Sequence, residues 1–477
     1  MTLKLALRIA IVVAILAIAA AARAQSVAPP PVDVVPSPKI SQPLTMDEAL
    51  ALAFQYNPDL AVATAQVNKA RGVVEEARAR FYPQFTGQVS QLYQKASNIP
   101  NPFPGAGQPP TINITPGSET AAQASFLLPL DVSGKLTYAS DIAKYQFQIQ
   151  YQNLLRQSEQ LIAQVKRNYY EVLRACGQAE TAQAAVDVAA LRLKNTQSRF
   201  EAGTVPKFDV TTAQVDLANL NQQLIAAKSR VNIAQANFSR VLGISPDSSI
   251  QVAKVDVPVT SAQVDVVASS KVAKERRPEV RAQQLNIALS RKNIKLQRTG
   301  YLPSLAVNGN YSIMSQASAF SSGNTNWMVT LAATQNIWDG GVTKARIDQA
   351  YGDLQVANAS LDQAELGVSQ EVATAALTLE EAARRTTTTA QSVALAEEAL
   401  RLANVRYEAG IAVLVEVTNA ESQLTQARFN LVNAEYDYAI ALADLQRATA
   451  TQPELEKLRL IDCSAVYKGV PKQPAAK

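Results

Sequence analysis

The chain of 477 residues contains no histidine and only two cysteines. This scarcity excludes Ser-His-Asp and Cys-His catalytic arrangements, histidine-based zinc sites and cysteine-cluster metal sites. Neither a P-loop nor a glycine-rich dinucleotide fingerprint occurs. Carboxylates remain for acid–base chemistry, but they are scattered along helix-like segments, where a solvated face is the default explanation. We therefore expect no enzymatic activity, no cofactor and no metal.

Charged residues are also few, at 18% of the chain, and aromatic residues make up 6%, whereas alanine is plentiful. Alanine favours long helices that approach one another closely. The length would suggest about three domains, but this composition argues against several compact ones. The net charge of +5 falls to +2 if the three basic residues before position 25 are removed. That charge is too small for nucleic-acid binding.

The N-terminus has the features of an export signal. Lys4 and Arg8 precede an apolar run that ends at Ala22, and small residues suited to a signal peptidase follow. We expect residues 1–24 to be a cleaved signal peptide and residues 25–43 to be a Pro-rich linker. A glutamine rather than a lipid-bearing cysteine follows the cleavage site. A retained membrane helix is the weaker alternative, because the run falls short of the roughly 18 apolar residues needed to span.

The chain is a tandem duplication. The segment 199–203, RFEAG, recurs at 406–410 as RYEAG, and the shift of 207 residues then holds without a gap for about forty residues. Earlier in each half, residues 58–85 match residues 278–305 at a shift of 220. These matches divide the chain into a first repeat (44–243), a connector (244–260), a second repeat (261–450) and a C-terminal tail (451–477).

Each repeat begins with helices and also contains a very long one. Thr45 and Glu48 form a capping box that opens a short helix, and a second helix runs from Pro58 to about Arg80. From Phe147 a 4-3 spacing of mostly apolar residues predicts a coiled-coil seam. Its members are Phe147, Tyr151, Leu154, Ser158, Leu161, Val165, Asn168 and Val172. Hairpins at 203–206 and 410–413 then return the chain.

Between the short and long helices the period changes from 3.6 to 2, which indicates strands with one apolar and one polar face. The predicted strands are 81–95, 119–132, 300–316 and 324–338, with a Pro/Gly-rich turn region at 98–117 between the first two.

These strands could form either a membrane barrel or an amphipathic sheet on a soluble core. The signal peptide and the nearly uncharged polar face favour a membrane barrel. Four strands cannot close one, since the smallest bacterial barrels have about eight, and open edges are not viable in lipid. Other subunits must complete the barrel.

These features resemble the TolC-type outer-membrane efflux proteins. The residues that carry the resemblance are the capped start at 44–50, Asn57-Pro58, and the paired hairpins at 199–203 and 406–410. It implies a mixed α and β membrane protein, in which each half supplies two transmembrane strands and long coiled-coil hairpins. Three copies would form one twelve-stranded barrel in the outer membrane, continued by a periplasmic helical tunnel. The implied partners are outer-membrane lipid, a periplasmic adaptor and, through it, an inner-membrane pump.

The resemblance also implies site residues. The hairpin tips that would contact the adaptor are Gly203, Thr204, Val205, Gly410, Ile411 and Ala412. Asp209 and Glu416 fall on acidic positions of a periplasmic gate, whereas Asn419 stands where many members carry a second carboxylate. Ala412 lacks the basic residue that some members use to latch the tip, so we expect no base to neutralise Glu416. The alternatives are that the two glycines are left-handed helix caps and that the two acids stabilise helix starts.

The two cysteines, Cys176 and Cys463, would lie in an oxidising compartment after export. The tail after Ala450 must turn back along the helices, so we hypothesise a disulfide that staples the tail to the long helix. Alternatively, Cys176 is a small apolar residue of the seam.

The predicted function is a passive exit duct for small molecules or proteins in efflux or type I secretion. A soluble periplasmic coiled-coil scaffold is the competing hypothesis. Cargo selection is expected at the pump, so this sequence does not identify the substrate.

Overall fold

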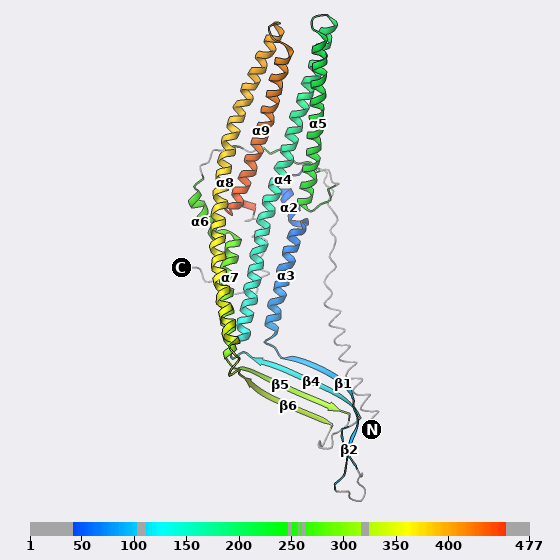
Figure 1. Ribbon diagram of the computed structural model, residues 1–477, viewed down its shortest axis with the longest axis vertical. Helices are drawn as coiled ribbons and strands as arrows, with labels where there is room; N and C mark the ends of the chain where they lie inside the picture. Colours follow the sequence, from blue (N-terminus) through cyan, green and yellow to red (C-terminus); the bar gives the residue numbers. More distant parts are fainter. Residues whose placement is uncertain are drawn as a thin grey trace. The chain divides into compact units, whose positions relative to one another are not determined.

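The computed structural model describes residues 42–102, 111–115, 117–246, 250–255, 258–259, 264–315 and 324–454. The predicted signal peptide, the linker up to Ser41, and the tail after Glu454 with Cys463 lie outside these residues. Both repeats share two short helices, two strands of one sheet and a long helical hairpin, in that order (Figure 1), and the first repeat also contains the short pair β2 and β3. The first contains α2 (Met46–Tyr56), α3 (Pro58–Ala79), β1 (Gln84–Tyr93), β2 (Ser97–Pro100), β3 (Thr111–Thr115), β4 (Ser118–Leu130), α4 (Lys135–Glu201) and α5 (Lys207–Leu242). The second contains α6 (Val266–Arg276), α7 (Pro278–Arg298), a 3-10 turn (Thr299–Tyr301), β5 (Ser304–Met314), β6 (Thr325–Thr334), α8 (Val342–Glu408) and α9 (Leu414–Ala448).

The described residues divide into two compact units. The first holds the strands together with the neighbouring parts of α3, α4, α7 and α8, within residues 69–147 and 286–357. The second holds α2, α6 and both long hairpins. No helix in the described stretches combines the length and hydropathy needed to cross a bilayer.

In the first unit, four antiparallel strands form a sheet in the order β1-β4-β5-β6. Phe85 pairs with Phe126, Phe126 with Gly309 and Gly309 with Val329, so these residues share one face of the sheet. That face is mainly apolar, with Gln91 as a polar exception, and its large apolar side chains include Phe85, Val89, Phe126, Leu128, Val307, Tyr311, Trp327, Val329 and Leu331. The opposite face is mainly polar, with Gln84, Thr86, Gln88, Gln123, Asn308, Asn310, Asn326 and Thr330.

The strands differ from their predicted form in three places. The strand predicted from residue 300 begins only at Ser304, because Thr299–Tyr301 forms a 3-10 turn. A second, two-stranded sheet pairs β2 with β3 inside the region expected to consist of turns, because Ser97–Pro100 finds an antiparallel partner in Thr111–Thr115. At the other end of the sheet, β6 stops at Thr334 and does not continue to residue 338. Asp339 then accepts hydrogen bonds from the backbone N–H groups of Gly341 and Thr343 and caps α8.

In the second unit, the largest apolar cluster surrounds Tyr169 of α4, which is fully buried. Its hydroxyl donates to the carbonyl oxygens of Leu44 (3.1 Å) and Ala253 (2.7 Å), two segments that a β-bridge between Leu44 and Val252 holds side by side. Burial raises the pKa of Tyr169 to about 12, so the hydroxyl remains a donor over the physiological range. Tyr169 thus joins the two connecting segments to the long helix.

Gly243 ends α5 where the chain passes close to the α2–α3 joint. Its φ is +77°, and an added Cβ would overlap the backbone of Tyr56. Asn57 fixes the joint, since its Nδ2 donates to the carbonyl oxygen of Val241 (2.8 Å). Both the left-handed backbone and the lack of space therefore require glycine at 243.

We predict that Gly243→Ala destabilises the protein more than Gly203→Ala. Gly203 has φ +76° but open space around it, so its substitution should cost about 1 kcal/mol for the left-handed backbone alone. Gly243→Ala must also displace the joint at Tyr56. Thermal unfolding followed by helical circular dichroism measures both losses, and equal losses would contradict the packing role of Gly243.

Candidate functional site

The predicted tip glycines cap the long helices. Gly203 (φ +76°) lets the backbone N–H of Thr204 donate to the carbonyl oxygen of Arg199 at 2.9 Å. At the second tip, Gly410 (φ +71°) lets the N–H of Ile411 donate to the carbonyl oxygen of Arg406 at 3.0 Å. Both bonds belong to left-handed cap motifs that satisfy carbonyls at a helix end. The cap function of the two glycines is thus observed, and adaptor contact stays a prediction.

Apolar side chains are exposed beside both tips. Ile411 is 73% exposed and Val413 64%, and Phe208 at the start of α5 is 68% exposed. The predicted tip residues Val205 and Ala412 are half-buried. Each hairpin therefore ends in a small apolar surface on a rigid cap.

The predicted gate residues have different surroundings in the two hairpins. Glu416 forms an ion pair with Arg406 across the second tip, at 3.3 Å. The expectation that Glu416 lacks a neutralising base is therefore wrong, because the last turn of α8 supplies the base that Ala412 does not. Both partners are about half exposed, so the pair stabilises the tip by less than about 1 kcal/mol.

In the first hairpin, Arg199 stands at the position equivalent to Arg406, yet its guanidinium lies over the ring of Tyr407, 5.4 Å from the centroid. This contact joins the end of α4 to the end of α8. Asp209 is half-buried in the first turn of α5, and Asn419 is exposed one turn beyond Glu416. No group of three or more metal-ligating side chains was found in the described parts of the chain.

A row of polar pairs, here called the ladder, joins α4 to α9 and was not predicted. Each step of seven or four residues along α4 is matched by an equal step back along α9, as expected for antiparallel helices. The pairs are Arg167–Asp444 (2.8 Å), Arg174–Asp437 (2.9 Å) and Gln178–Asn433 (2.6 Å). Because α4 belongs to the first repeat and α9 to the second, the ladder holds the two repeats together.

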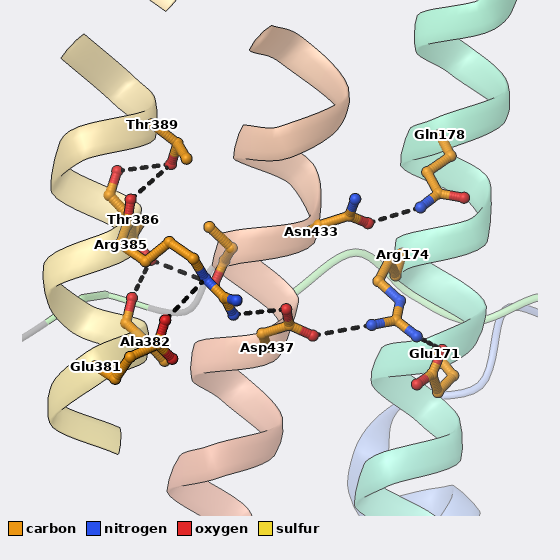
Figure 2. Close-up of polar contacts among 11 residues, drawn as sticks. Glu171, Arg174, Gln178, Glu381, Ala382, Arg385, Thr386, Thr389, Asn433 and Asp437 are labelled. Atoms are coloured by element: carbon orange, nitrogen blue, oxygen red, sulfur yellow. Dashed lines mark hydrogen bonds and ion pairs between the residues drawn. The ribbon is translucent and has the colours of Figure 1, made fainter. Parts of the chain in front are cut away.

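Asp437 lies at the centre of the ladder (Figure 2). One carboxylate oxygen accepts from Arg174, and the other accepts from Arg385 of α8 at 2.7 Å. Glu171 pairs with Arg174 from within α4. An open groove of about 810 Å³ lies along these residues, lined also by Arg230 and Asn168. Asn168, predicted as a seam residue, is half-buried beside this groove.

Nearer the tips, Arg192 forms a buried junction between the hairpins, with 9% of its side chain exposed. It pairs with Asp216 of α5 and Glu421 of α9. Burial raises the pKa of Glu421, although the charge of Arg192 opposes that shift. Neutralising Glu421 is therefore easier than neutralising an ordinary glutamate.

Cys176 is half-buried against the apolar cluster around Tyr169, and burial raises the pKa of its thiol. This environment matches that of a small apolar packing residue. Cys463 lies outside the described residues, so the disulfide stays a prediction.

We predict that Arg192→Met is strongly destabilising at neutral pH and less so at acidic pH. Removing one partner leaves a buried carboxylate uncompensated, which costs about 3–5 kcal/mol. Burial holds the pKa of Glu421 above its unfolded value. The cost is therefore fully present above that raised pKa and disappears as the pH falls through it and Glu421 binds a proton.

The control is Arg428→Met, which breaks the exposed pair with Glu397 and should cost less than about 1 kcal/mol at either pH. Thermal unfolding at both pH values tests the pair of variants. A deficit of Arg192→Met that does not change with pH would rule out an uncompensated Glu421.

Comparisons with known proteins place this architecture in a family. The family model described as "Outer membrane efflux protein" matches residues 49–244 and 269–451, nearly all of both repeats. Outer membrane protein TolC of Vibrio cholerae is 24% identical over 413 residues, covering 84% of this chain and 90% of the relative. TolC of Escherichia coli is 23% identical over 437 residues, which cover 88% of this chain and 85% of the relative. Protein CyaE of Bordetella pertussis is 24% identical over 403 residues, which cover 84% of this chain and 81% of the relative.

Solved structures have the same fold. The outer membrane protein VceC of Vibrio cholerae superposes with a TM-score of 0.70 at 19% identity, covering 85% of this chain and 95% of VceC. The CmeC outer membrane channel of Campylobacter jejuni gives a TM-score of 0.72 at 15% identity, and the match covers 87% of this chain and 88% of CmeC. With the family model matched across both repeats, the chain belongs to the outer membrane efflux protein family and is an outer-membrane channel for efflux or secretion.

Proposed function

We propose that three copies of this chain form a passive exit duct through the outer membrane, which an inner-membrane pump feeds through a periplasmic adaptor. The observation that carries the proposal is a four-stranded sheet with one apolar face and with β1 and β6 at its edges. In lipid every backbone N–H and C=O needs a partner. Pairing β6 of one copy with β1 of the next supplies those partners, and three copies give twelve strands.

Exposed apolar side chains on the outer helices of the two hairpins support the same assembly. On α5, Ile225 is 70% exposed, and on α8, Leu395 is 72% exposed. Others at intervals along these helices are Val215 and Ile233 of α5 and Leu366, Leu377 and Leu402 of α8. Contacts between α5 of one copy and α8 of the next would bury both rows and continue the barrel as a helical tunnel.

Adaptor binding is proposed at the hairpin tips, where exposed Ile411, Val413 and Phe208 adjoin capped, well-defined helix ends. Among the relatives are one named toxin and drug export protein A and one named cobalt-zinc-cadmium resistance protein CzcC. Such different names among similar chains support a duct without its own cargo selection. The duct requires no catalysis, and the apolar sheet face argues against the soluble scaffold.

The gate proposal places three copies of Glu416, with Asp209 nearby, around the periplasmic mouth of the duct. A ring of carboxylates in a narrow mouth attracts cations. Arg406 offsets each Glu416 charge, so the two residues should act in opposite directions on ion selectivity.

We predict that Val307→Arg and Tyr311→Arg each reduce the yield of heat-modifiable trimer in outer-membrane fractions. Both native residues lie on the apolar face, and an arginine there should cost about 2–4 kcal/mol near the bilayer midplane. Asn308→Arg, on the polar face of the same strand, is the matched control and should assemble normally. Normal trimer yield from both apolar-face variants would overturn the proposal.

A second prediction concerns conductance of the reconstituted channel. Glu416→Gln should weaken cation preference and block by multivalent cations, and Arg406→Gln should strengthen both, because it leaves the carboxylate unpaired. If neither substitution changes selectivity or block, Glu416 does not face the pore, although the chain would still be a duct.

A further inference from the structure

The four junctions between strands and helices in the first unit share an unusual surface, here called the collar. Each junction exposes apolar or aromatic side chains. Trp338 is 88% exposed, Tyr82 is 69% exposed and Val132 is 65% exposed. The apolar members of the collar are Phe81, Tyr82, Val132, Tyr301, Leu302, Ile337 and Trp338.

Basic side chains stand at the same four junctions, within the helix turns that adjoin the sheet. Those that are exposed are Arg80 at the end of α3, Lys135 at the start of α4, Lys295 and Arg298 at the end of α7, and Lys344 and Arg346 at the start of α8. The two lysines at helix starts oppose the helix dipole, which disfavours a cation in the first turn. Helix stability therefore does not account for Lys135 and Lys344.

The acidic residues at the helix starts are engaged elsewhere. Asp131 accepts from the backbone N–H groups of Leu136 and Thr137, both at 2.8 Å. Asp339 caps α8 in the same way, and hydrogen bonds from Thr343 lower its pKa. These carboxylates serve the helix N-termini and not the lysines. Arg80 does pair with Glu76, but both are more than half exposed, which makes that pair weak.

The described strands of the sheet lack this basic character. Between residues 84 and 130 the only charged side chains are Lys95 and Glu119, and between residues 304 and 334 there are none. Positive charge is thus concentrated on the side of the sheet from which the helices leave.

We propose that the collar binds the anionic headgroups of phospholipids in the leaflet next to the helices. The inference rests on the proposed membrane position of the sheet. Aromatic side chains prefer the headgroup level, and lysine and arginine extend their charged ends toward lipid phosphates while their stems cover apolar surface. Each base near an anionic membrane surface strengthens binding about fivefold. The collar would thereby set the depth of the barrel in the bilayer.

The test compares the protein in nanodiscs of phosphatidylcholine with nanodiscs that also contain phosphatidylglycerol. The collar variant carries Arg80→Gln, Lys135→Gln, Lys295→Gln and Lys344→Gln. The matched control removes four exposed bases of α4, α5 and α6 instead: Lys194→Gln, Lys228→Gln, Arg240→Gln and Lys271→Gln. A charge-conserving variant (Arg80→Lys, Lys135→Arg, Lys295→Arg, Lys344→Arg) checks that the collar positions tolerate substitution.

We expect phosphatidylglycerol to raise the Tm of the wild type, the control and the charge-conserving variant, and to raise that of the collar variant by less than half as much. Added salt should reduce the gain, since surface charges are screened. An equal gain in the collar variant and the wild type, or no gain in the wild type, would overturn the proposal. Heat-modifiable trimer formed by the collar variant in phosphatidylcholine separates this result from failure of the duct proposal.

Discussion

Backbone hydrogen bonding in lipid is the constraint on which the rest of this molecule depends. A strand in a bilayer must find a partner for each N–H and C=O group, and the sheet order leaves β1 and β6 with neighbours on one side only within the described sheet. The described sheet cannot meet this requirement alone, so its two edges need further strands as partners. Every residue of β1 is exposed in the single chain, and in the proposed trimer the next copy and lipid would cover its edge and its apolar face.

The duplicated sequence meets a second requirement, which is to join two similar halves in one fixed register. Asp437 achieves this by accepting from Arg174 of the first repeat and Arg385 of the second (Figure 2). Having both repeats in one chain also lets equivalent positions diverge. Arg406 pairs with Glu416, whereas its counterpart Arg199 stacks on Tyr407. The two hairpins are therefore related in sequence but have different contacts at their ends.

Local periodicity was sufficient to predict much of the architecture. The alternation in β5 and β6 identified the apolar face, and the RFEAG and RYEAG motifs identified the hairpins and the family, which the family model confirms. The ladder could not be predicted, because Arg174 and Asp437 are 263 residues apart and their pairing depends on the register of two separate helices. The pair of Arg406 and Glu416 could have been predicted from the sequence, because a tight hairpin brings positions on either side of Gly410 together.

The polar contacts of the hairpins change from buried to exposed between Arg192 and the tips. Arg192 is buried and pairs with two carboxylates, and removing it would leave charges without compensation. Beyond it, the pair of Arg406 and Glu416 is about half exposed, and water competes for both partners. Local opening requires least free energy where contacts are few and exposed. We therefore expect motions of the hairpin ends to be easy on the tip side of Arg192 and costly on its other side. In the proposed duct, the Arg192 junction would then separate a mobile mouth from a rigid wall.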